Sequence, residues 1–166
     1  MMADMVRICH VEELSLLPRW LELVVGYHCS DSFHEPSKYP IEIELRRKVQ
    51  GFEVDMVVTC RSGKRVNRIG FELKKSDWAK AIKQAIERRA LFHYFYIVLD
   101  MYSFSILGML RSHREALEYG IGFISARDNC IVIKSYTKAN WRESRSYAYT
   151  ILPYLNTNNE GVESHA

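Results

Sequence analysis

Two neighbouring runs of alternating apolar and polar residues, 52–58 and 69–74, constrain the fold of this chain more than any other feature. Alternation with a period of two is typical of β-strands that bury one face. The segment between the runs contains Gly63 and Lys64, and a two-residue turn there would place the glycine where a type II′ turn requires it. The sequence therefore predicts an antiparallel hairpin with a defined register.

In this register Asp55 lies opposite Glu72, and Glu53 lies opposite Lys74. Directly opposed residues of an antiparallel pair share a face, and a slip of one residue would move carboxylates onto the apolar side. The predicted apolar partners are Val54 with Leu73, Met56 with Phe71, and Val58 with Ile69. Two acids and a lysine are therefore expected to converge on the other face.

Opposed carboxylates destabilise each other unless a cation lies between them. Mg²⁺ binds a few carboxylate oxygens and keeps water and substrate phosphate in its shell, which suits Asp55 and Glu72. Lys74 would then orient water or neutralise charge on a phosphate. The alternative is a surface hairpin in which Glu53 pairs with Lys74 and both other acids are solvated.

An Asp on one strand followed by Glu-x-Lys on the next resembles the PD-(D/E)XK nuclease superfamily. The resemblance covers roughly residues 10–135 and implies an α/β, restriction-endonuclease-like fold, with a central mixed β-sheet flanked by α-helices. It implies that Asp55, Glu72 and the backbone carbonyl of Leu73 bind Mg²⁺ or Mn²⁺, and that Lys74 assists the attacking water. Val54 stands where many members have proline. Further candidate acids are Glu12 or Glu13 on the first helix and Glu42 or Glu44 on the first strand.

The segment after Lys74 predicts a helix capped by Ser76 or Asp77. Its buried stripe is expected to consist of Trp78, Ala81, Ile82, Ala85 and Ile86, and its polar row of Lys80, Gln84 and Arg88. Many members of the superfamily carry a Gln near the metal site on this helix, followed four residues later by Tyr. Gln84 fits that pattern and is a candidate catalytic residue, whereas Arg88 stands in the place of the Tyr.

Positive charge is concentrated between Arg46 and Arg89, where thirteen lysines and arginines face five acids, although the net charge of the whole chain is only +3. A basic rim around an acidic centre suits a polyanion such as DNA. A solvated sheet edge that discourages aggregation is the alternative. The candidate nucleic-acid-binding residues are Arg61, Lys64, Arg65, Lys75, Lys80, Lys83 and Arg88.

The four cysteines, at positions 9, 29, 60 and 130, form no Cys-x-x-Cys pair, so neither a zinc site nor a disulfide framework is expected. Reduced thiols and a soluble, cytoplasmic protein are predicted. A metal site formed by His28, Cys29 and His34 is not favoured, because no fourth ligand follows at a suitable spacing. The sequence offers no membrane span and no phosphate loop for a nucleotide cofactor.

The rest of the chain predicts one domain over residues 1–155 and a polar, disordered tail over 156–166. Helices are expected at 10–26, 112–119 and 141–155, the last for packing, dimerisation or nucleic-acid contact. A loop is expected at 28–40, and strands at 41–47, 94–99, 121–125 and 130–136.

These features favour a metal-dependent nuclease that hydrolyses phosphodiester bonds in DNA. A non-catalytic nucleic-acid-binding or assembly module with the same fold, or a nuclease acting on RNA, stays open as an alternative. Cutting both strands with one site per domain would favour a symmetric homodimer.

Overall fold

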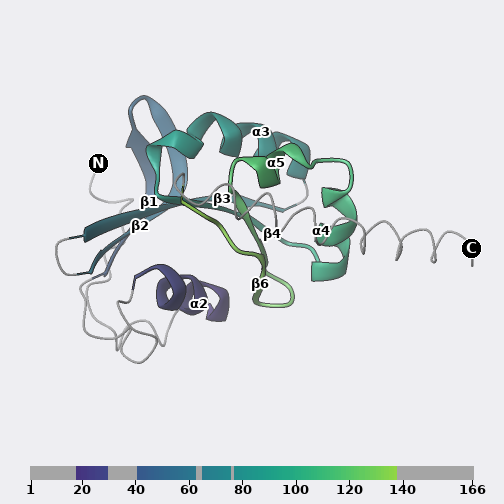
Figure 1. The fold of residues 1–166 in the computed structure, drawn as a ribbon, viewed down its shortest axis with the longest axis horizontal. Coiled ribbons are helices and arrows are strands. Elements are labelled where there is room, and N and C mark those ends of the chain that lie inside the picture. The colour runs from purple at the N-terminus through teal and green to yellow at the C-terminus, as the bar shows by residue number, and fades with distance from the viewer. Residues whose placement is uncertain (1–17, 30–40, 63–64, 76, 138–166) are drawn as a thin grey trace, which may run out of the picture.

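The computed structural model describes residues 18–29, 41–62, 65–75 and 77–137. Over these residues the protein is an α/β structure with a six-strand mixed sheet and four α-helices. This agrees with the predicted α/β class. Figure 1 shows how the helices are arranged around the sheet. Four predicted segments lie outside the described residues: the start of the first helix (10–17), most of the loop (30–40), the C-terminal helix (141–155) and the polar tail (156–166).

The strands follow one another across the sheet in chain order. Strands β1 to β3 are antiparallel, β4 and β5 continue in parallel with β3, and β6 returns antiparallel to β5. Their bounds are β1 (Ile41–Val49), β2 (Phe52–Ser62), β3 (Arg65–Lys74), β4 (Tyr94–Leu99), β5 (Gly122–Ser125) and β6 (Cys130–Ile133). The parallel pairs exist because helical segments connect β3 to β4 and β4 to β5.

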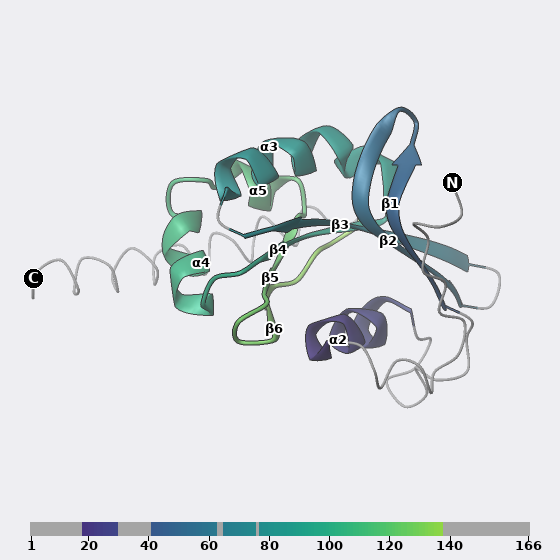
Figure 2. The same cartoon turned by 180° about the vertical axis from the view of Figure 1, so that it is seen from behind.

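Helices cover both faces of the sheet. Helix α2 (Arg19–His28) lies on one face, and α3 (Trp78–Arg88) and α5 (Glu115–Glu118) lie on the other (Figures 1 and 2). A short 3₁₀ turn, η2 (Arg89–Leu91), ends α3, and α4 (Ser103–Leu110) lies at the end of the sheet where β3 and β4 finish. The sheet thus separates two hydrophobic cores.

Alternation along the strands assigns each side chain to one core. Phe71 and Tyr96 pack with Trp20 of α2, whereas Ile97 packs with Ile82 of α3. The predicted stripe of α3 is confirmed, since Ala81, Ile82 and Ala85 are buried and Trp78 and Ile86 are partly buried against the same core. Of the two predicted caps, Asp77 is the one used, and its Oδ1 accepts from the Lys80 N–H at 3.4 Å.

The predicted hairpin register is confirmed from Ser62 opposite Arg65 as far as Met56 opposite Phe71. The paired ladder ends there, and the prediction that all six apolar partners share one face is wrong at the last pair. Val54 belongs to the core on the α3 side, and Leu73 is 41% exposed.

A distortion at the middle of the β1–β2 ladder explains this error. Arg46 has φ of 52°, a left-handed conformation uncommon for a residue with a side chain, and the paired positions skip from Leu45 to Arg47. Beyond it, residues 47–54 form a hairpin tip that rises on the α3 side of the sheet (Figure 1). Gln50 and Gly51 at its turn have φ of 47° and 87°, as a type I′ turn requires.

Helix α4 was not anticipated from the sequence. It is apolar on most sides, with Ile106, Met109 and Leu110 buried, so it lacks the polar face by which an amphipathic helix is recognised. Helix α5 occupies only the middle of the predicted 112–119 helix. The strand predictions are confirmed to within a few residues.

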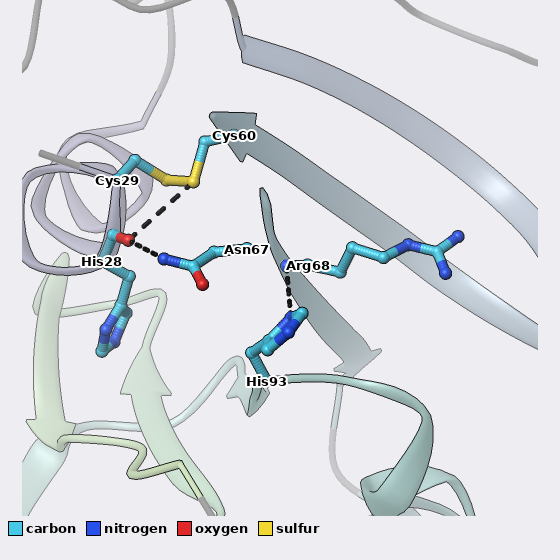
Figure 3. The surroundings of a disulfide bond; sticks show 6 residues. All are labelled: His28, Cys29, Cys60, Asn67, Arg68 and His93. Carbon is cyan, nitrogen blue, oxygen red and sulfur yellow. Dashed lines mark hydrogen bonds between the residues drawn. A yellow bond between two sulfur atoms is a disulfide. The ribbon is translucent and has the colours of Figure 1, made fainter. Parts of the chain in front are cut away.

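Cys29 at the end of α2 forms a disulfide with Cys60 of β2 (Figure 3). The expectation of reduced thiols and no disulfide is therefore wrong for this pair. The two cysteines meet because α2 packs across the end of β2, where Asn67 donates a hydrogen bond to the His28 carbonyl at 2.9 Å. Disulfides are uncommon in cytosolic proteins, so this bond does not support the predicted cytoplasmic location.

Within the described part of the chain, no helix has the length and apolar character needed to cross a bilayer.

Gly70 permits close packing under α3, and replacing it by Ala is expected to destabilise the fold. An added Cβ would lie 2.6 Å from the Phe95 ring and 2.9 Å from Phe92, so the two rings would have to move. Overpacking of this kind costs about 1–3 kcal/mol. Chemical denaturation measures the loss, with Gly26→Ala as the control. Gly26 lies in α2 with open space around it, and its replacement should be neutral or slightly stabilising. Equal stability of the two variants would contradict the packing argument.

Candidate functional site

Glu72 lies on the face of the sheet that α3 covers. Its strand neighbours Ile69 and Phe71 point into the α2-side core, so alternation turns Gly70, Glu72 and Lys74 the other way. Glu72 is only 3% exposed, an unusual position for a carboxylate without a compensating charge. Lys74, half-buried two residues further on, is close enough to Glu72 to favour its ionised form.

Asp55 joins Glu72 at the point where β2 separates from β3. The Leu73 N–H donates to Asp55 Oδ2 at 2.8 Å, so a side chain takes the place of the next backbone bond between the strands. The Glu72 and Asp55 carboxyls lie close enough to interact, and the negative charge of Asp55 favours the protonated form of Glu72. Asp55, Glu72 and Lys74 therefore converge, although Asp55 and Glu72 are not ladder partners.

Arg88, at the end of α3, points into this site. Its Nε lies 3.5 Å from Glu72 Oε1 and donates to the Glu53 carbonyl at 3.3 Å, and its Nη1 donates to the Gln84 carbonyl at 3.1 Å. The guanidinium also lies over the Phe52 ring, 5.1 Å from its centroid. Arg88 thus joins α3, the hairpin tip and the buried acid, and only 12% of its side chain is exposed. This geometry suits a role inside the site better than the predicted contact with a nucleic-acid backbone.

Two buried side-chain oxygens accept no hydrogen bond: Glu72 Oε1 in the site and Gln84 Oε1 on α3, one turn before Arg88. The Arg88 contact to Glu72 Oε1 is an ion pair longer than a good hydrogen bond. Carboxylate and amide oxygens are the donors that Mg²⁺ and Mn²⁺ prefer. Asp55 and Glu72 therefore offer oxygens of the kind that a divalent cation binds, and Gln84 carries a further oxygen of this kind on the helix that covers them. Among the described residues no three His, Cys, Asp or Glu side chains gather into a metal-binding group, so a third acid is not provided there.

The other candidate acids do not join the site. Glu44 faces the same side as Glu72 but is two strands away, about 12 Å by strand spacing. Its Oε1 pairs with Arg47 Nη1 at 3.0 Å. Glu42 belongs to the same distant strand, and Glu12 and Glu13 lie outside the described residues. The carbonyl of Leu73 stays a prediction from the resemblance.

The predicted nucleic-acid-binding residues fall in separate places. Lys75, Lys80 and Lys83 are exposed after β3 and along α3, on the side of the sheet that holds Glu72. Arg61 and Arg65 pair within the β2–β3 ladder near its turn, seven residues from Glu72 or about 24 Å along the strand. Lys64 lies outside the described residues. The lysines of α3 therefore lie on the same side of the sheet as the acids, whereas Arg61 and Arg65 lie toward the other end of the β2–β3 ladder.

Sequence reasoning assigned Arg88 to the nucleic-acid backbone and Arg89 only to the general positive charge of its segment. Arg88 lies four residues after Gln84, a spacing that places both on one helix face and was the available signal for its role near Glu72. Arg89 is not part of the predicted basic rim, because it is only 2% exposed and donates hydrogen bonds to backbone carbonyls. Nothing in the local sequence distinguishes this buried arginine from the exposed ones.

The pKa of Glu72 is raised to about 7, chiefly by burial and next by the neighbouring Asp55, while Arg88 and Lys74 lower it by less. In the unfolded chain the pKa returns to the ordinary value of about 4.5. Between these values only the folded state holds the proton. Stability from this group is therefore fully present below pH 4.5 and is lost as the pH rises to 7.

As the pH rises through this window, the free energy of unfolding of wild type should therefore fall by on the order of 2 kcal/mol relative to that of Glu72→Gln. The difference between the two proteins must be measured, because His28 acts in the opposite direction. Burial lowers the pKa of His28 to about 3, so its contribution is lost as the pH falls. Urea denaturation in EDTA across the window gives the difference, and Mg²⁺ should reduce it by favouring the ionised acid. If the difference in stability did not change with pH, the raised pKa of Glu72 would be contradicted.

We found no family model, curated protein or solved structure that matches this chain.

Proposed function

We propose that this protein is a metal-dependent nuclease that hydrolyses phosphodiester bonds in DNA, with a restriction-endonuclease-like fold of the PD-(D/E)XK type. The observation that carries the proposal is the contact between the carboxyls of Asp55 and Glu72 beneath α3. Structural acids avoid each other, whereas acids that share a divalent cation must lie together. Lys74, on the same strand face, supplies the third element of the motif.

The residues of the chain have distinct roles in this proposal. Asp55, Glu72 and the amide oxygen of Gln84 would hold Mg²⁺ or Mn²⁺, whose chemistry is to polarise a phosphate oxygen and to acidify water. Lys74 would neutralise charge that develops on the phosphate. Arg88 holds the hairpin tip against α3 and balances the charge of Glu72. The exposed lysines 75, 80 and 83 would contact the nucleic-acid backbone.

A panel of labelled linear, nicked, flapped, branched and single-stranded DNA, incubated with Mg²⁺, Mn²⁺ or EDTA, tests the proposal. Cleavage of at least one substrate with either metal, and none in EDTA, is the expected result. RNA of the same sequence should be included, because the motif does not distinguish the two sugars. Cleavage that persists in EDTA, or no cleavage of any substrate, would refute the proposal.

The ion pair between Arg88 and Glu72 favours a second candidate, a non-catalytic nucleic-acid-binding module, because a guanidinium can balance the acid without a metal. The same panel separates the two. A binding module would retain DNA in a mobility-shift assay and leave it intact with every metal. Neutralising Lys80 and Lys83 should in either case reduce the slope of log affinity against log salt by about one per lost phosphate contact.

A further inference from the structure

Two aromatic side chains at the start of α4 are exposed and belong to neither hydrophobic core. Phe104 is 64% and Tyr102 is 55% exposed, the largest values among the large hydrophobic residues that the structure describes. Single exposed apolar residues are common. Two exposed rings within three residues, one of them in contact with a positioned arginine, offer faces that a flat partner can use.

The positioned arginine is Arg127, in the turn after β5. Its guanidinium carbon lies 5.1 Å from the centroid of the Tyr102 ring, and its Nε is 3.1 Å from Asp100 Oδ1. About half of the Arg127 side chain is still exposed. Tyr102, Phe104 and Arg127, called the α4 patch below, therefore combine aromatic faces with a held guanidinium.

The α4 patch follows the edge of the sheet at which the candidate site ends. Lys74, Leu99 and Ser125 are neighbours across three parallel strands, and the Asp100 N–H donates to the Lys74 carbonyl at 3.2 Å. Tyr102 comes three residues after Leu99, so its backbone lies within about 15 Å of Lys74. Figure 2 shows α4 at this end of the sheet.

Charge indicates what kind of group the α4 patch would hold. Asp100 balances Arg127, and Asp128 accepts a hydrogen bond from the Ser103 N–H at 2.6 Å, so the patch carries no excess positive charge. A surface that followed a phosphate backbone would need such an excess. Aromatic faces beside a balanced arginine suit stacking of a base, which tolerates any sequence.

We propose that the α4 patch stacks an unpaired base of the nucleic-acid substrate, next to the site formed by Asp55, Glu72 and Lys74. This inference rests on the proposed function, and it narrows the substrate to nucleic acid with a single-stranded part. In a duplex the bases are already stacked on each other and cannot reach the rings.

The test measures binding of a fluorescein-labelled single-stranded DNA oligonucleotide and of a blunt duplex, in EDTA. Full-length protein carrying Glu72→Gln is compared with and without Tyr102→Ala or Phe104→Ala. Each alanine should weaken single-strand binding about tenfold, leave duplex binding unchanged and leave the salt slope unchanged. Tyr102→Phe should bind as the parent does.

Tyr27→Ala is the matched control, because Tyr27 is 47% exposed on α2 and has Lys134 Nζ 5.1 Å from its ring centroid. It should bind both DNAs as the parent does. An equal loss in this control, an equal loss on the duplex, or no loss in both α4 variants would overturn the proposal. So would a change of oligomeric state in sedimentation without a change in DNA affinity, which would assign the rings to a protein contact.

Failure of this inference is distinguishable from failure of the proposed function. Metal-dependent cleavage by wild type with unaltered binding by the α4 variants would refute the patch alone. Single-strand binding through the patch without cleavage in Mg²⁺ or Mn²⁺ would refute the nuclease alone. Absence of both binding and cleavage would refute both.

Discussion

Replacing Asp55 by Asn or Glu72 by Gln is expected to lower the rate of DNA cleavage in Mg²⁺ at least about 100-fold. Each change keeps the shape of the side chain and removes the charge of a proposed metal ligand. Binding should be unchanged or tighter, because one negative charge near the phosphate is lost. Single-turnover cleavage and fluorescence anisotropy on the same labelled DNA measure the two effects separately.

Glu118→Gln is the matched control, since Glu118 is exposed on α5 and its replacement removes the same charge from the protein. It should cleave as wild type does. Lys74→Met should also reduce cleavage strongly, with little change in metal affinity, if the ammonium acts on the phosphate. Wild-type rates in either acid variant would remove that acid from the site.

Replacing Arg89 by Met is expected to produce the largest loss of stability, at least about 3 kcal/mol. The Arg89 guanidinium donates to the carbonyls of Tyr119 and Phe92 at 2.8 Å, of His93 at 3.2 Å, and of Tyr136. These carbonyls lie just after α5, just after η2 and in the segment that follows β6, so one side chain joins three parts of the chain. Met fills a similar volume but donates nothing, which would leave buried carbonyls without a donor.

Thermal and urea denaturation measure this loss, with Arg114→Met as the control for an exposed arginine. Arg114→Met should change the free energy of unfolding by less than about 0.5 kcal/mol. Arg89→Lys should fall between wild type and Arg89→Met, because an ammonium has fewer donors and a different geometry. If Arg89→Met were as stable as the control, the carbonyl contacts would contribute nothing measurable.

The distortion at Arg46 links the fold to the candidate site. A regular ladder would keep the β1–β2 hairpin flat and would leave Phe52 and Glu53 far from α3. The left-handed residue instead lets the hairpin tip rise, and Arg88 meets both the Phe52 ring and the Glu53 carbonyl. Where the hairpin tip rises, the β2–β3 pairing ends at Met56 opposite Phe71. Beyond this point the Asp55 side chain accepts a hydrogen bond from the Leu73 N–H.

Local patterns in the sequence determined the strands, the hairpin register and α3. Alternation requires only neighbouring residues, so Met56 and Phe71 were correctly paired, and Asp77 and the apolar stripe identified α3. The convergence of Asp55, Glu72 and Lys74 was also predicted, but the ladder that was expected to produce it ends at Met56 opposite Phe71, and the Leu73 N–H holds Asp55 instead. Helix α4 was missed because a helix that is apolar on most sides has no polar face to mark its period.

Contacts between distant segments were decided only by the tertiary structure. The disulfide joins Cys29 to Cys60 because α2 packs across the end of β2, and no spacing in the sequence encodes that meeting. The separate environments of Arg88 and Arg89, one beside Glu72 and one among backbone carbonyls, likewise depend on which elements pack around the end of α3. Sequence periodicity assigns a residue to a face, whereas burial, partner and charge balance arise from the segments that cover that face.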